Sequence, residues 1–129
     1  MKTIVIEGSR IHDIRSLYEE INRVFMQGED WKLAESLDAF NDLLYGGFGA
    51  ILHENEVKII WNHAAQSQKA LGFETTKIYY ENKLMHPELY NVALFKAKLS
   101  DLISGKGPTY YEIIKEIIAS HPKIQLVEN

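Results

Sequence analysis

The sequence predicts one α/β domain in which helices cover a small, mostly parallel sheet. Three observations support this class: three short apolar segments typical of strands, segments of helical periodicity between them, and a length of 129 residues, which suits one domain and not two. Connections that contain helices are long enough to join parallel strands. We therefore expect residues 1–129 to form one domain in which strands 2–7, 57–61 and 123–127 make one parallel sheet.

The first strand and the first helix follow from local patterns. Residues 2–7 (KTIVIE) are a β-branched run that ends at Gly8. Asp13 can cap a helix that runs to about Gln27, with Glu19, Glu20 and Arg23 expected on the side facing water. The apolar residues of this helix recur at spacings of three and four, and are Ile14, Leu17, Ile21, Val24 and Phe25.

A second helix is expected between Ser36, which can cap its start, and Tyr45, since Gly46 and Gly47 favour a helix end. The second strand, 57–61 (VKIIW), is almost entirely apolar, which is typical of a strand buried on both faces. A third helical stretch is expected to open at Asn62 or His63.

Residues 73–104 predict two further helices, one over 76–85 and a longer one that ends near 103. Thr109 with Glu112 three residues later is a capping-box pattern, so a last helix is expected to begin there. Its buried side should carry Tyr110, Ile113, Ile114, Ile117 and Ile118, and the strand 123–127 (KIQLV) follows.

The net charge of −4 is concentrated in one segment. Residues 28–42 (GEDWKLAESLDAFND) hold five acidic side chains against one lysine, and the remaining 13 acidic and 13 basic residues cancel. A negative chain is a poor candidate for direct nucleic-acid binding. The acidic segment is either a solvated surface or a docking surface for a cationic partner.

Helix geometry places the carboxylates together. At about 100° per residue, Glu35, Asp38 and Asp42 fall within about 60° of one another, and the apolar residues Leu37, Phe40 and Leu44 lie opposite. Like charges at this spacing repel by a few tenths of a kcal/mol per pair. A helix that concentrates charge at this cost indicates a role toward a partner.

Catalytic and metal-binding patterns are not found in the sequence. None of the five histidines forms an i, i+4 pair, the GK at 105–106 lacks the residues of a phosphate loop, and cysteine is absent. Asp38, Asp42 and Glu35 could act as acid and base, but no neighbouring histidine or lysine would orient a substrate. We expect no catalytic residue, metal or cofactor.

The composition and the N-terminal sequence indicate the cellular compartment in which the protein is expected. The absence of cysteine fits a reducing cytoplasm. The apolar N-terminal stretch is too short for a secretory signal, and no apolar run is long enough to span a membrane. We expect a cytoplasmic protein.

Residues 34–46 (AESLDAFNDLLYG) resemble the second-helix signature of the barstar family, intracellular inhibitors of microbial ribonucleases. The strand 4–8, the segment 59–61 with the following 66–69, and the final helix and strand also match in pattern. The resemblance covers about residues 2–71 and 107–127. It implies a barstar-like fold, a three-stranded parallel sheet covered by helices, here with 73–104 as an extra helical insertion.

The resemblance also implies how the chain binds. Two aspartates of this helix would enter the active site of a ribonuclease in place of substrate phosphate, and they correspond to Asp38 and the more deeply inserted Asp42. The partner would be a basic ribonuclease or nuclease toxin domain, bound by a monomer in a 1:1 complex, as in an immunity protein. The expected partner-binding residues are Trp31, Glu35, Asp38, Asn41, Asp42, Tyr45, Gly46 and Glu116.

Departures from the family pattern bear on specificity. Asn41 stands where the family has an aromatic residue, and Gly47 replaces a tryptophan. The tyrosine ahead of the helix is not matched position for position, although Trp31 can take its place. Such changes alter the aromatic surroundings of the charges and suggest a different ribonuclease target. Two alternatives stay open: a barstar-fold module for a partner that is not a nuclease, and a small hydrolase that uses Asp38, Asp42 and Glu116.

Overall fold

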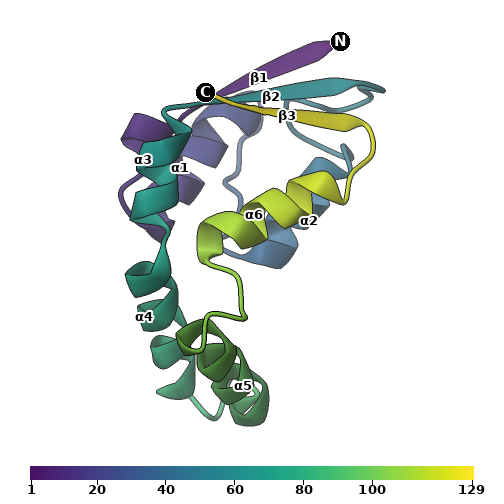
Figure 1. The fold of residues 1–129 in the computed structure, drawn as a ribbon. Coiled ribbons are helices and arrows are strands. Elements are labelled where there is room, and N and C mark those ends of the chain that lie inside the picture. The colour runs from purple at the N-terminus through teal and green to yellow at the C-terminus, as the bar shows by residue number, and fades with distance from the viewer.

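The computed structural model describes residues 1–129 and contains one sheet of three strands in the order β1-β2-β3 (Figure 1). Both neighbouring pairs are parallel, which confirms the predicted fold class. The strands are β1 (Lys2–Glu7), β2 (Val57–Asn62) and β3 (Ile124–Glu128). The helical elements are a 3-10 turn η1 (Gly8–Arg10), α1 (Ile14–Phe25), α2 (Leu37–Leu44), α3 (Ala64–Ala70), α4 (Phe73–Leu84), α5 (Val92–Ile103) and α6 (Tyr110–Ala119).

The helices lie on one side of the sheet only (Figure 1). Along β2, Val57, Ile59 and Trp61 are buried, whereas the residues between them are half-exposed. On the open face, Val5 of β1 is opposite Ile60 and remains 44% exposed. The expectation that β2 is buried on both faces is therefore wrong, because all the crossover helices pack against the same face.

The sheet and the helices are joined at the carboxyl end of β1. The hydroxyl of Ser67 in α3 donates to the carbonyl of Gly8 at 3.1 Å and accepts from the indole Nε1 of Trp61 at 2.9 Å. The Trp61 ring also meets the ring of Tyr111 in α6 edge-on, at 5.2 Å between centroids. One buried hydroxyl thus links η1, which directly follows β1, with β2 and α3, and the tryptophan extends this connection to α6.

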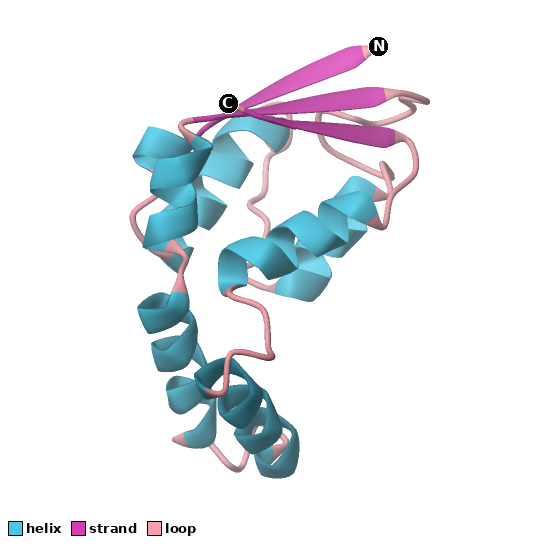
Figure 2. Cartoon of the chain, viewed as in Figure 1, coloured by secondary structure: helices cyan, strands magenta, loops and turns pink.

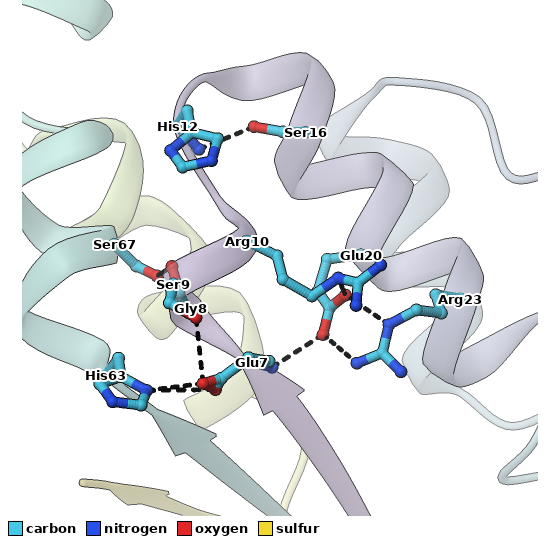
Figure 3. Close-up of polar contacts among 10 residues, drawn as sticks. All are labelled: Glu7, Gly8, Ser9, Arg10, His12, Ser16, Glu20, Arg23, His63 and Ser67. Atoms are coloured by element: carbon cyan, nitrogen blue, oxygen red, sulfur yellow. Dashed lines mark hydrogen bonds and ion pairs between the residues drawn. The ribbon is translucent and has the colours of Figure 1, made fainter.

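Glu20 is buried, with 2% of its surface exposed, although the sequence placed it on the solvent side of α1. Its carboxylate accepts the backbone N–H of Glu7 at 2.7 Å and pairs with Arg23 at 2.6 Å and Arg10 at 3.3 Å (Figure 3). A buried carboxylate is tolerated only when its oxygens are paired. The two arginines and the backbone amide of Glu7 supply that pairing. The amide and Arg10 lie far from Glu20 in the sequence, so a local pattern does not predict that this carboxylate is buried.

The extra helices α4 and α5 form a hairpin that extends away from the sheet (Figure 2). It is attached to α6 by the Thr76 hydroxyl, which accepts the Tyr110 amide at 2.8 Å, and by the rings of Tyr79 and Tyr110, 5.1 Å apart. The two helices expected over 73–104 are thus confirmed, with the first of them, α4, beginning at Phe73. The division of the chain into a single domain remains a prediction.

We predict that Gly8→Ala lowers the free energy of unfolding by about 1–3 kcal/mol, the usual cost of overpacking. A Cβ at Gly8 would lie 2.6 Å from the His63 carbonyl and from the Ser67 hydroxyl, so the β2–α3 turn would have to move. Urea denaturation measures the change. Gly28→Ala is the matched control, because a Cβ there has no atom within 4 Å; equal stability losses in both variants would contradict the prediction.

Candidate partner-binding surface

Helix α2 is fixed at its start and along its apolar side. The hydroxyl of Ser36 accepts the backbone N–H of Ala39 at 2.9 Å, which satisfies one of the unpaired donors of the first turn. Phe40, Leu43 and Leu44 are fully buried. One face of α2 is therefore buried in the core. Leu43 belongs to this buried face, although the sequence analysis named only Leu37, Phe40 and Leu44.

Asp38 and Asp42 lie on the opposite, exposed face of α2. Neither carboxylate forms an ion pair anywhere in the chain. Asp38 is in the first turn, where the helix dipole favours a negative charge, and Asp42 is not. Two unneutralised carboxylates thus point into solvent from a rigid helix.

The C-terminal end of α2 is closed by a lysine from the α6–β3 connection. Lys123 Nζ donates to the carbonyl of Tyr45 at 3.1 Å, which satisfies an acceptor at the negative end of the helix. Gly46 follows with φ of +82°, and a Cβ there would lie 2.5 Å from the same ammonium. The positive φ at 46 favours glycine, whereas the ammonium is the end of a flexible side chain that can move aside.

Asn41 points inward. Its Oδ1 lies 2.7 Å from Nε2 of His121, a buried residue at the end of α6. Burial lowers the pKa of His121, and the nearby Lys123 lowers it further. His121 also contacts the Tyr45 ring edge-on at 4.7 Å, and this tyrosine is 68% exposed. The pair of Asn41 and His121 positions α2 on α6, whereas Tyr45 stands at the surface.

The remaining expected residues flank α2. Trp31 packs on the ring of Phe48, 4.9 Å away, and is 45% exposed. Glu35 is exposed and precedes the cap Ser36, so it lies just before the helix and not on its face as expected. Glu116 of α6 is exposed and lines the same groove as Glu35 and Asp38.

The expected site residues thus fall into three groups. Glu35, Asp38 and Glu116 meet along one groove. Asn41, Asp42, Tyr45 and Gly46 belong to the carboxyl-terminal end of α2, and Trp31 lies in the segment that leads into it. Sequence reasoning missed His121 and Lys123, which support α2 from the other end of the chain; no local pattern links positions 41 and 121.

Two further features bear on the chemistry available here. No group of three or more histidine, cysteine, aspartate or glutamate side chains is arranged to hold a metal ion. None of the helices combines the length and the apolar character needed to cross a membrane.

We predict that His121→Gln flattens the pH dependence of stability. Because the folded-state pKa of His121 is lowered from 6.5, its contribution is fully present above about pH 6.5 and is lost as the pH falls through the folded-state pKa. Urea denaturation at pH 7.5 and pH 5.5 measures the loss in wild type and variant. The other four histidines are common to both proteins, so an identical loss would contradict the assignment.

Comparison with protein families identifies one match. The family described as barstar (barnase inhibitor) matches residues 1–79, which contain α2 with Asp38 and Asp42 and end within α4. None of the curated proteins matches the chain. The matched region is more than half of the chain, and it includes the residues 34–46 on which the resemblance was based. The chain belongs to the barstar family of barnase inhibitors, which are inhibitors and not enzymes.

Proposed function

We propose that this chain inhibits a barnase-type ribonuclease by seating the exposed face of α2 in the active site of the enzyme. The observation that carries the proposal is the pair of exposed, unpaired carboxylates of Asp38 and Asp42 on a helix whose other face is fixed in the core. Membership of a family of ribonuclease inhibitors supports the class of partner. A cytoplasmic location and an immunity role toward a nuclease toxin belong to the same proposal.

Charge explains why such a helix would suit this partner. A site that binds RNA phosphate must present cationic groups, so a row of carboxylates is its electrostatic complement. Complementary charge also steers the encounter and raises the association rate. Asp38 and Asp42 have no cation in their own chain to release before they bind.

Rigidity explains why the helix would be an effective plug. The Ser36 cap, the buried apolar side and the Lys123 contact at Tyr45 hold both ends of α2. A preorganised surface avoids the entropy cost of ordering a loop on binding. Trp31 and Tyr45 are exposed beside α2, and aromatic side chains contribute much of the binding energy where an interface buries them.

We predict that Asp42→Ala weakens binding to the ribonuclease by about 2–5 kcal/mol, the general cost of truncating one partner of a buried charge pair, for which the barnase–barstar complex is itself a reference case. Stability should barely change, because Asp42 is exposed in the free protein and its removal relieves repulsion from Asp38. Calorimetric titration against a panel of inactivated barnase-type ribonucleases, barnase included, measures the affinity.

Raised salt should slow the association of the wild-type protein with the ribonuclease, because salt screens the attraction between the carboxylates and the cationic site.

Glu81→Ala is the control, since Glu81 is also exposed and forms no ion pair but lies on α4. It should bind within about 0.5 kcal/mol of wild type, as expected for a surface position outside the contact. Equal affinities for the Asp42 and Glu81 variants would overturn the proposal, and so would the failure of every ribonuclease to bind.

A further inference from the structure

A groove of about 690 Å³ separates α2 and α6 from the α4–α5 hairpin. One wall carries Glu35, Asp38 and Glu116, which belong to the expected partner-binding surface. The opposite wall belongs to the hairpin, most of which lies beyond the region that matches the barstar family. The groove is thus continuous with the candidate partner-binding surface, but one of its walls comes mainly from residues outside the region that matches the family.

Four aromatic side chains, of which Tyr80 is largely buried, line the hairpin wall of the groove. The ring of Tyr80 lies 5.4 Å from that of Tyr79 and 6.1 Å from that of Phe95, and Phe95 lies 5.9 Å from Tyr90. Lys83 places its ammonium 3.9 Å from the centre of the Tyr90 ring. A cation is thus already held against the π face of a tyrosine within this groove.

The carboxylates of the groove outnumber its cations. Asp101 of α5 joins the three carboxylates of the other wall, against only Lys83 and Lys98. None of these four carboxylates forms an ion pair. Asp101 is exposed in the last turn of α5, where the helix dipole disfavours a negative charge, so the carboxylate gains nothing from its own helix.

We propose that this groove is a second part of the ribonuclease-binding surface and that it takes an arginine-bearing loop of the partner; this rests on the proposed function. Arginine fits both walls, because its planar guanidinium stacks on aromatic rings and donates two parallel hydrogen bonds to a carboxylate. A loop seated between α2 and the hairpin would contact both sides, so the hairpin would select among ribonucleases that all accept the α2 carboxylates.

The experiment compares variants that remove the same charge from the same hairpin. Asp101→Asn removes a carboxylate from the groove, and Glu81→Gln removes one from the exposed side of α4, which does not line the groove. Calorimetric titration uses the same panel of inactivated barnase-type ribonucleases, with Asp42→Ala measured alongside. Thermal unfolding checks that each variant folds.

The expected result is a rise in the dissociation constant of about three- to tenfold for Asp101→Asn, typical of the loss of a partly exposed charged hydrogen bond, and no change for Glu81→Gln. Tyr90→Ala should produce a similar rise through loss of the ring. In a double-mutant cycle, the effect of Asp101→Asn should disappear when one particular arginine of the ribonuclease is replaced by alanine.

The outcomes separate the two proposals. If Asp42→Ala weakens binding but Asp101→Asn behaves like Glu81→Gln, the groove is not part of the contact and only this inference is overturned. If Asp101→Asn weakens binding without coupling to any arginine, the assigned occupant is wrong. If no ribonuclease binds the wild type, the proposed function and this inference both fail.

Discussion

The fold depends on the close approach of Gly8 to the turn between β2 and α3. There is no room for a side chain at this point, because the Ser67 hydroxyl and two backbone carbonyls already surround the glycine. The contact brings the carboxyl ends of β1 and β2 against α3 through one hydroxyl, and Trp61 extends it to α6. Since α6 and the residues after it hold α2, the presentation of the acidic helix depends on packing far from its charges.

Helix α2 combines a structural face with a charged one, and the magnitudes show why this is stable. Repulsion between Asp38 and Asp42 costs only a few tenths of a kcal/mol. Burial of Phe40, Leu43 and Leu44 contributes about 1.5–3 kcal/mol for each side chain. The core side of the helix therefore offsets the cost of its exposed side many times over, and charge can be concentrated there without loss of the fold.

Local patterns were sufficient to predict the strands, the Ser36 and Thr109 caps and the acidic face of α2, because each depends on residues a few positions apart. The burial of Glu20 could not be predicted, since one of its partners, the Glu7 amide, is 13 residues away. The open face of the sheet was also missed: an almost entirely apolar strand shows that both of its faces can be buried, not that helices cover both. The contacts of Asn41 and the groove require positions 80 or more residues apart, or helices that meet only in the folded chain.

The parallel register has a consequence for how fast the protein folds. Lys2 lies opposite Val57, and Val57 lies opposite Ile124, so stretches of 55 and 67 residues must be closed before the two strand pairs can form. The entropy of these closures is lost before the strand contacts repay it, which makes such topologies slow to fold compared with helical bundles. Helices depend on local contacts, whereas the three-stranded sheet depends on contacts between distant parts of the chain. We therefore expect the sheet to form later than the helices. Chain topology, and in particular the pairing of the three strands, is thus expected to limit how fast this protein folds.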